Sequence, residues 1–256
     1  MASTRPYYAP ASLSVAFYDL VTAADDELAG DIDLYAGLAA TPDATILELG
    51  AGAGRVAFAL AQRGFTVTGV DISPAMLARA EAARADLNSE VSDRVTLRRG
   101  DMTSLDLKQI FGLVLCPYFT LAHVPTGAAW RNTFATAAHH LAPGGLAAFH
   151  LPLLEIMRRP GPANPQLPVL DRPLGDGRRL QLYIRERGFR EGVGRLDQVI
   201  EYVELDPKGR VLRRSPERLT YYLTDPAPLA ASAGLALDRP PVALGGVGEV
   251  WVFRKG

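Results

Sequence analysis

Apolar positions follow two different rhythms along this chain, and the change falls near residue 152. Before it, runs of consecutive apolar residues alternate with segments of helical periodicity, which is typical of buried parallel strands joined by helices. The expected buried strands are residues 45–49, 65–70, 95–97, 112–116 and 146–151. After a proline-rich stretch, apolar and polar residues alternate at 179–189, 195–205 and 211–223, which predicts antiparallel strands. The sequence therefore predicts an α/β fold with an inserted antiparallel β-sheet.

We expect four segments along the chain. Residues 1–40 should form an N-terminal helical cover, extended at first and then continuing as two helices, with the acidic run 25–27 at the start of the second. Residues 41–151 should form the ligand-binding core. Residues 152–223 should form the antiparallel insertion, acting as a lid, a dimerisation surface or both. Residues 224–256 should add a closing helix and a β-hairpin that turns at Gly245-Gly246.

A glycine-rich turn follows the first expected strand, in the stretch TILELGAGAGR over residues 45–55. Glycines at 50, 52 and 54 allow a tight turn and let backbone N–H groups approach a ligand, which a Cβ atom would block. The residues from Arg55 onward have a helical rhythm, so the N-terminus of a helix should point at that ligand.

Two acidic residues stand at the ends of the next strands. Asp71 ends the second strand, 17 residues after Gly54, where a carboxylate can accept hydrogen bonds from both hydroxyls of a ribose. Asp101 and Met102 end the third strand, and this pair would match the exocyclic amine and one face of an adenine ring. Together with the glycine turn they favour a ligand that contains adenosine.

The glycines alone leave a second interpretation open. Residues 52–57, GAGRVA, also fit the GxGxxA turn of an NAD-dependent oxidoreductase. Against that interpretation stand Glu48, two residues before the first glycine, and Asp101, because a dinucleotide site requires neither.

The three strand ends together resemble the class I S-adenosylmethionine-dependent methyltransferases over roughly residues 40–151. The ExGxGxG motif of that family matches Glu48, Gly50, Gly52 and Gly54, its ribose-binding acid matches Asp71, and its adenine-binding acid matches Asp101. The resemblance implies S-adenosyl-L-methionine as the cofactor, with Arg55 near its methionine moiety and Met102 against adenine. Further cofactor contacts implied by the family are Tyr18, Ala51, Ile72, Met76 and Cys116, although core packing explains Tyr18 and Met76 equally well.

With its insertion, the chain looks like the glycine and amino-sugar N-methyltransferases. This resemblance implies a Rossmann-like, seven-stranded, mostly parallel sheet with an antiparallel C-terminal hairpin. It also implies methyl transfer to a nitrogen or oxygen of a small-molecule acceptor, with an amino sugar or another natural-product intermediate as candidates.

The loop after the fourth strand, residues 117–123, should lie at the ligand-binding edge of the sheet. Its start, Cys116-Pro117-Tyr118, departs from the Asn/Asp-Pro-Pro-Tyr signature of enzymes that methylate nucleobases or glutamine, so such acceptors are disfavoured. His123 resembles a histidine that amino-sugar N-methyltransferases carry there, which implies a general base or an orienting group. An ordinary role in the loop before Pro125 is an equal alternative. Tyr8 and Tyr18 are further catalytic candidates.

Composition narrows the class of partner. With 256 residues, of which 48% are hydrophobic, the chain suits one α/β domain plus an insertion. Its net charge of −1 gives no general attraction to nucleic acid or anionic membranes, which disfavours a macromolecule-modifying methyltransferase. The single cysteine excludes an internal disulfide, and no His, Cys or carboxylate spacing resembles a metal site. Because the N-terminus lacks the apolar core of a signal peptide, we expect a cytoplasmic protein.

Two features leave alternatives open. Residues 158–218 contain 14 Lys or Arg against 9 Asp or Glu. These arginines either lie on the solvent face of the inserted sheet or bind an anionic group of the substrate, such as a phosphate. His139 and His140 fall in the last turn of a helix expected over 126–141, where they favour an interaction with the helix dipole over metal binding.

Overall fold

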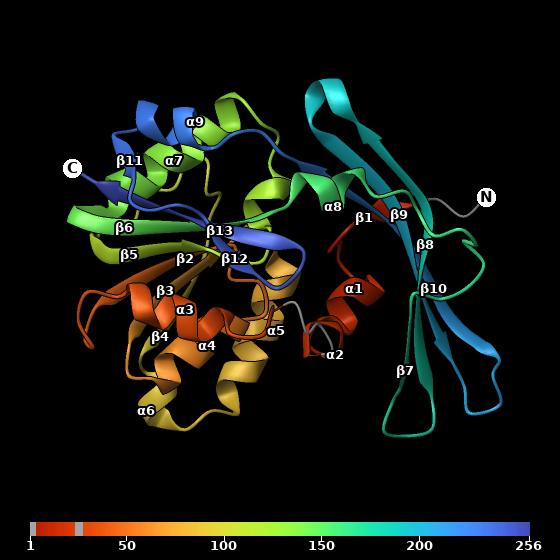
Figure 1. Ribbon diagram of the computed structural model, residues 1–256. Coiled ribbons are helices and arrows are strands. Elements are labelled where there is room, and N and C mark those ends of the chain that lie inside the picture. Colours follow the sequence, from red (N-terminus) through yellow and green to blue (C-terminus); the bar gives the residue numbers. More distant parts are fainter. Residues whose placement is uncertain (1–3, 24–27) are drawn as a thin grey trace.

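The computed structural model describes residues 4–23 and 28–256, and it shows two β-sheets side by side with short helices between them (Figure 1). The larger sheet contains the five parallel strands expected from the sequence. They are β2 (Thr45–Leu49), β3 (Thr66–Asp71), β4 (Val95–Arg99), β5 (Phe111–Cys116) and β6 (Leu141–Pro152). Strands β2 and β5 and the C-terminal half of β6 consist mainly of buried apolar residues, which is why consecutive apolar runs predicted them, whereas the edge strand β4 buries only Val95.

The strands of the larger sheet lie in the order β11-β13-β6-β5-β2-β3-β4. The C-terminal strands β11 (Leu235–Leu237), β12 (Val242–Leu244) and β13 (Gly248–Lys255) are antiparallel to their neighbours, and β13 pairs with β6. This arrangement confirms the predicted α/β class with a mostly parallel sheet and an antiparallel C-terminal end.

The C-terminal hairpin differs from the expectation in one respect. The hairpin expected from the sequence, with its turn at Gly245-Gly246, has a single strand on each side of the turn, with the first over residues 235–242, but the structure divides that first strand into β11 and β12, both paired with β13. Pro240 and Pro241 lie between them, and a proline has no N–H group with which to continue the ladder. Among the described residues the sheet therefore has eight strands rather than seven.

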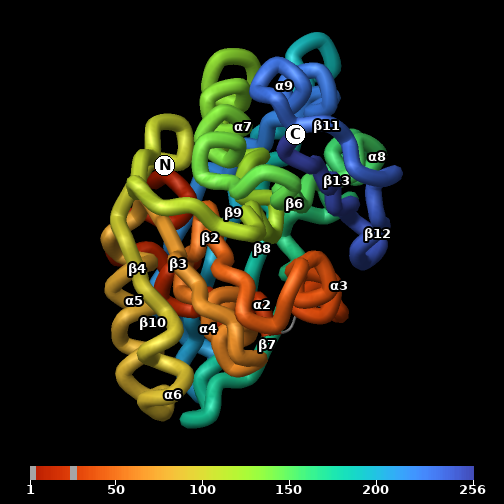
Figure 2. The backbone as a smooth tube through the Cα atoms, turned by 90° about the vertical axis from the view of Figure 1, so that its left-hand side faces the viewer, coloured from red at the N-terminus to blue at the C-terminus, as the bar shows by residue number. Residues whose placement is uncertain are grey.

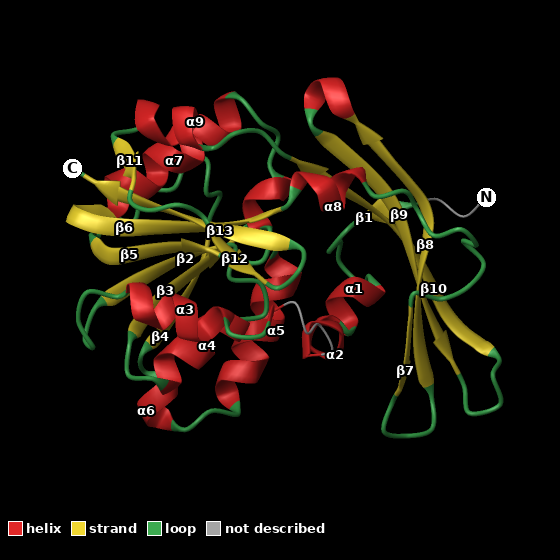
Figure 3. Cartoon of the chain, viewed as in Figure 1, coloured by secondary structure: helices red, strands yellow, loops and turns green. Residues whose placement is uncertain are grey.

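Helices cover both faces of the larger sheet (Figures 1 and 3). One face carries α3 (Asp31–Leu38), α4 (Arg55–Gln62), α5 (Pro74–Ala85) and α6 (Ser89–Ser92), and the other carries α7 (Ala128–His140) and α9 (Ala227–Ser232). Alternate residues of the strands enter the two apolar cores, as Ile46 and Leu47 of β2 show. Helix α5 begins as expected at Ser73, whose hydroxyl accepts a hydrogen bond from the backbone N–H of Met76, with Pro74 in the first turn.

The second sheet is the predicted antiparallel insertion. Its strands are β7 (Leu170–Pro173), β8 (Arg179–Arg190), β9 (Arg195–Leu205) and β10 (Val211–Tyr222), close to the three alternating runs of the sequence. The chain reaches it through α8 (Leu154–Arg158), and a short 3-10 helix, η3 (Glu191–Val193), joins β8 to β9. Figure 2 views the molecule from the side of the larger sheet, with the insertion behind it.

The N-terminal cover joins the two sheets. Its first residues form β1 (Arg5–Pro6), which pairs in parallel with β10 and so adds a fifth strand to the second sheet. Among the described residues of the cover, three short helices follow where we expected two, because the chain breaks at Phe17 between α1 (Leu13–Ala16) and α2 (Tyr18–Ala23). The acidic run 25–27 lies outside the described residues. Over those residues, no helix is long and apolar enough to cross a membrane.

Candidate active site

A cavity of about 660 Å³ opens at the carboxyl ends of β2, β3 and β4, beneath the N-terminal segment. Most side chains that the sequence singled out line it. These are Tyr8, Tyr18, Glu48, Gly50, Ala51, Gly52, Arg55, Asp71, Ile72, Met76, Asp101, Met102 and His123. Two expected cofactor positions do not line it. Gly54 packs against the Phe58 ring of its own helix, and Cys116 is fully buried inside the second apolar core.

The glycine turn brings backbone against two different neighbours. Gly50 adopts a φ of 77°, and a Cβ atom there would overlap the side chain of Thr120 in the 3-10 helix η2 (Thr120–His123). Gly52 adopts a φ of 56°, and its missing Cβ would lie 3.4 Å from Met76 and 3.6 Å from the Tyr18 hydroxyl. The absence of a side chain at Gly50 thus allows the loop after β5 to pack against the turn. The absence of one at Gly52 leaves space for a ligand at the floor of the cavity.

Asp71 is fixed by backbone donors. Its Oδ2 accepts a hydrogen bond from the N–H of Gly52 and its Oδ1 accepts one from the N–H of Ser73, each at 2.8 Å. Burial nevertheless raises the pKa of this carboxyl above its usual value, against the effect of these hydrogen bonds. The carboxyl therefore ties the glycine turn to the start of α5 while it lines the cavity.

Glu48 and Arg55 form the most deeply buried charged part of the site. Glu48 is 2% exposed, and its Oε2 has no hydrogen-bond partner within the described part of the chain. Burial raises the pKa of Glu48 to about 8, although the neighbouring Arg55 opposes this shift. The guanidinium of Arg55 donates to both carboxylate oxygens of Asp31 on α3, at 3.2 and 2.5 Å. Sequence analysis missed Asp31, because no local pattern connects it to residues 24 positions away.

Asp101 and Met102 line the cavity just after the end of β4. The Oδ1 of Asp101 accepts hydrogen bonds from the backbone N–H and the hydroxyl of Thr103, each at 2.8 Å, and its side chain is exposed. Met102 is half-buried and packs against the apolar core beneath α7.

Aromatic side chains gather around His123, in another part of the cavity. The rings of Tyr7 and Tyr8 are 4.2 Å apart, and they lie 6.4 and 6.1 Å from the ring of His123. Behind them, the Tyr7 and Tyr202 hydroxyls share a hydrogen bond of 2.8 Å, and the Tyr221 ring meets His123 edge-on at 4.9 Å. Tyr7, Tyr202 and Tyr221 were missed by sequence analysis. The only available signal was the Tyr7-Tyr8 pair, since the other two are ordinary inward positions of strands.

Burial sets the protonation of the three catalytic candidates. It lowers the pKa of His123 to about 4, so the imidazole is neutral at pH 7 and able to accept a hydrogen bond. Burial also raises the pKa of Tyr18 to about 12 and that of Tyr8 well above 10, so both phenols keep their protons at neutral pH. None of the three is a strong base in this setting, and each can orient a polar group.

Charge divides the cavity into two ends. Among the described residues, the charged side chains that line the cavity are Glu48, Arg55, Asp71 and Asp101, all of them at or beside the glycine turn and the strand ends. The end around His123 is lined by tyrosine, proline, threonine and small apolar side chains. We call these the polar end and the aromatic end, and they meet where Gly50 lies against Thr120.

The arginines of the insertion face other partners. Arg185 and Arg214 both pair with Glu201, and Arg178 and Arg213 both pair with Glu204. No arginine of residues 158–218 lines the cavity. Of the two interpretations, the structure favours ion pairs on the inserted sheet over contacts with an anionic substrate.

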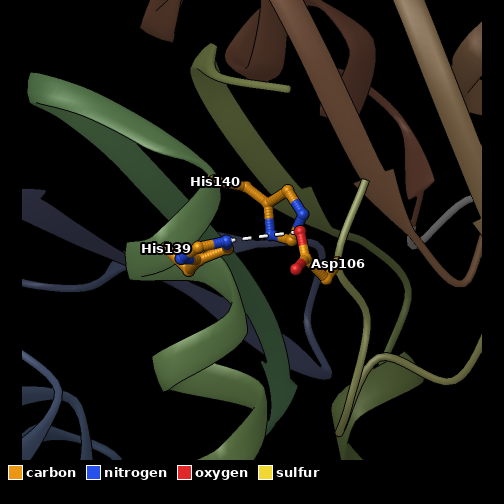
Figure 4. A group of neighbouring side chains, drawn as sticks. All are labelled: Asp106, His139 and His140. Atoms are coloured by element: carbon orange, nitrogen blue, oxygen red, sulfur yellow. Dashed lines mark hydrogen bonds and ion pairs between the residues drawn. The ribbon is translucent and has the colours of Figure 1, made fainter. Parts of the chain in front are cut away.

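A group with metal-like spacing lies away from the cavity, at Asp106, His139 and His140 (Figure 4). His140 uses both ring nitrogens, because its Nδ1 lies 2.8 Å from the carbonyl oxygen of Thr136 and its Nε2 accepts from the N–H of Leu107 at 2.9 Å. His139 approaches Asp106 at 3.4 Å. With the lone pair of His140 occupied, this group fastens the loop before β5 to the end of α7, as a structural link.

Comparison with known proteins identifies relatives of the core and of the whole fold. Residues 46–145 match a family described as a methyltransferase domain. The carboxy-S-adenosyl-L-methionine synthase of Chromohalobacter salexigens is 40% identical over 87 residues, a match that covers 32% of this chain. It spans only 30% of the length of that curated relative.

Two solved structures resemble almost the whole chain. The CcbJ methyltransferase from Streptomyces caelestis superimposes with a TM-score of 0.64 at 25% identity, covering 90% of each chain. CalS10 from Micromonospora echinaspora, an amino pentose methyltransferase solved with S-adenosylmethionine bound, gives a TM-score of 0.66 at 22% identity over 93% of this chain and 96% of its own. The chain therefore shares a domain with the first family and its overall fold, insertion included, with these two proteins.

Proposed function

We propose that this chain, an S-adenosylmethionine-dependent methyltransferase as its strand ends predicted, transfers a methyl group to an amino nitrogen of a small-molecule acceptor such as an amino sugar. The observation that carries this proposal is the division of one cavity into a polar end and an aromatic end. The matches to a methyltransferase domain and to whole methyltransferase structures support the same class and do not favour an NAD-dependent oxidoreductase.

The polar end fits the cofactor. Gly52 leaves open the space that a side chain would fill, and Glu48 lines the same cavity with a buried oxygen that has no partner among the described residues, which suits a polar ligand that can hydrogen-bond to it. In this assignment Asp71 accepts from the ribose hydroxyls, Asp101 and Met102 contact adenine, and Glu48 with Arg55 faces the methionine moiety. When bound, S-adenosylmethionine supplies a methyl group activated by a sulfonium.

The aromatic end fits an amine acceptor. Its buried surroundings disfavour the protonated form of an amine, so the nucleophile is held neutral without a strong base. Neutral His123 accepts a hydrogen bond from the amine, and the Tyr8 hydroxyl donates to a polar group of the acceptor. The Tyr18 hydroxyl lies beside Gly52, at the polar end, and can donate to a group of either ligand. Alignment of the reacting atoms and exclusion of water then account for the rate enhancement.

A small molecule is the acceptor that suits this enclosure. Within the part of the chain that the structure describes, no lysine or arginine lines the aromatic end, where it would bind the backbone of a nucleic acid. The function of CalS10, an amino pentose methyltransferase, supports an amino sugar. We also propose a lid role for the insertion, because its apolar face packs on Leu13 and Phe17 of the chain itself. A homodimer through the insertion stays a prediction.

Two measurements test this function. Calorimetric titration with S-adenosylhomocysteine and with NADH should show binding of the first alone, and the reverse result would overturn the cofactor assignment. A panel of amino sugars and of the matching sugars with hydroxyl in place of amine, each incubated with methyl-labelled cofactor, should give label on the amines. Label transferred only to hydroxyl groups would contradict the acceptor class.

A further inference from the structure

The N-terminal segment 5–18 is attached by its backbone to the second sheet. Besides the pairing of β1 with β10, the N–H of Tyr7 donates to the carbonyl oxygen of Arg218 at 3.0 Å. The N–H of Leu13 donates to the hydroxyl of Ser215 at 3.3 Å, and the Leu13 side chain is buried among residues of the same sheet. The insertion therefore holds the N-terminal segment 5–18 in place over the cavity.

Glu217 lies at the centre of this attachment. It is 0% exposed, on the inner face of β10, and its Oε1 accepts hydrogen bonds from the N–H of Ser14 at 3.2 Å and from the hydroxyl of Ser215 at 2.6 Å. Its Oε2 has no hydrogen-bond partner in the described ranges 4–23 and 28–256. Burying a carboxylate in this way is costly, and an apolar side chain would avoid the cost. A glutamate at this position is explained by the hydrogen bonds with which its carboxylate holds Ser14 and Ser215 in place.

The hydrogen bonds continue from Glu217 to the cavity. The hydroxyl of Ser14 accepts from the N–H of Tyr8 at 3.2 Å and lies 2.9 Å from the hydroxyl of Ser12, which caps α1. Tyr8 has a φ of 58°, a left-handed conformation that costs a residue with a side chain about 1–2 kcal/mol and persists only where its surroundings hold it. The network ends at this residue, whose ring lies 5.9 Å from the ring of Tyr18.

We propose that Glu217 is a positioning residue, which fixes segment 5–18 on the second sheet and thereby sets Tyr8 and Tyr18 over the cavity. It acts through Ser14 and does not line the cavity itself. The part of this inference that concerns ligand binding rests on the proposed function.

The test compares two substitutions of similar size. Glu217→Met removes both acceptor oxygens, whereas Glu217→Gln keeps one acceptor for Ser14 and Ser215. Glu201→Met is the matched control, because Glu201 belongs to the same sheet but pairs with Arg185 and Arg214. Should Glu217→Met not fold, Ser14→Ala removes the link to Tyr8 and replaces it.

Hydrogen exchange, resolved by peptide, and titration with S-adenosylhomocysteine are the two readouts. In Glu217→Met we expect exchange over residues 5–18 to rise about tenfold and cofactor-product affinity to fall about tenfold, the scale for losing a hydrogen bond to a charged group. Exchange over 195–205 should stay unchanged. Glu217→Gln should recover most of both losses, and Glu201→Met should show neither.

Three results would overturn the proposal. The first is unchanged exchange over 5–18 in Glu217→Met, and the second is unchanged affinity despite faster exchange. The third is an equal rise over 5–18 and 195–205, which would mark a role in the stability of the sheet alone. If the wild-type protein does not bind S-adenosylhomocysteine, the proposed function fails, while the exchange comparison still decides whether Glu217 fixes the segment.

Discussion

The two ends of the cavity are built in opposite ways. The polar end comes from one continuous stretch, residues 48–55, together with acids at the ends of two neighbouring strands. The aromatic end is assembled from the N-terminal segment, the loop after β5 and two strands of the insertion, and its hydrogen-bonded pair Tyr7 and Tyr202 is separated by 195 residues in the chain. Backbone atoms and charges shape the first end, whereas rings packed against one another shape the second. The polar end is therefore suited to a ligand that many proteins bind, whereas the aromatic end is suited to one particular acceptor.

The largest expected effect lies where the two ends meet, at Gly50. Gly50→Ala would force alanine into a left-handed conformation and push its methyl group into Thr120. We expect the free energy of unfolding to fall by about 2–5 kcal/mol, the sum of the conformational and overpacking costs. Chemical denaturation measures this change.

Two further variants separate those costs. Gly64 has a φ of 96° with nothing within 4 Å of the missing Cβ, so Gly64→Ala should carry only the conformational part. Adding Thr120→Ser to Gly50→Ala removes the crowded methyl group and should recover part of the stability. Equal losses in Gly50→Ala and Gly64→Ala would mean that the two ends do not constrain each other here.

The second prediction separates the ends by function. His123→Ala should bind S-adenosylhomocysteine normally but lose about 10²-fold or more in kcat, because the acceptor would no longer be oriented. Since the pKa of His123 is about 4, its imidazole stays neutral from pH 5 to 8 and contributes no acid limb to the wild-type profile in that range. Steady-state kinetics with the true acceptor measures both quantities.

A loss of cofactor affinity in His123→Ala would show that this residue serves both ends. A kcat within a few-fold of the wild type would remove it from the chemistry altogether. His139→Ala is a suitable control, because that histidine stands in the last turn of α7 and does not line the cavity.

The third prediction ranks the two acids of the polar end. Asp71→Ala should weaken S-adenosylhomocysteine binding by about 1–3 kcal/mol, because it strands the N–H groups of Gly52 and Ser73 as well as the ribose hydroxyls. Asp101→Ala should weaken binding less, since that side chain is exposed and holds only Thr103. Calorimetry on both variants decides the order. Equal effects, or the reverse order, would contradict the interpretation that hydrogen bonds from the backbone to Asp71 fix the geometry of the polar end.

The sequence predicts the polar end of the cavity better than it predicts the aromatic end. The sequence predicts the parallel strands, the glycine turn and the acids Asp71 and Asp101, because each depends on residues close together in the chain. The sequence also predicts the strands of the insertion, because a strand with one buried face shows a simple alternation of apolar and polar residues. Less was predictable for β11 and β12, where Pro240 and Pro241 interrupt a strand that the apolar pattern continued, and for the break at Phe17 between α1 and α2.

At the site, the missed residues share one property. Asp31, Tyr7, Tyr202 and Tyr221 take part through contacts across large sequence separations, which no spacing rule records. Gly54 and Cys116 were assigned to the cofactor from the family motif and the strand end, but the structure directs one toward Phe58 and the other into the core. A motif locates a turn, and only packing decides which of its atoms face the ligand.

The smallest expected effect tests whether the rings of the aromatic end act together. Tyr7 and Tyr202 share a hydrogen bond of 2.8 Å that joins the N-terminal segment to the insertion behind His123. In a double-mutant cycle of Tyr7→Phe and Tyr202→Phe, we expect a coupling of about 0.5–1.5 kcal/mol in kcat/KM for the acceptor, the net value of one such bond. Affinity for S-adenosylhomocysteine should not change, because neither ring belongs to the polar end. Additive effects would show that this hydrogen bond does not shape the acceptor site, and a coupled change in cofactor affinity would show that the two ends are not separate.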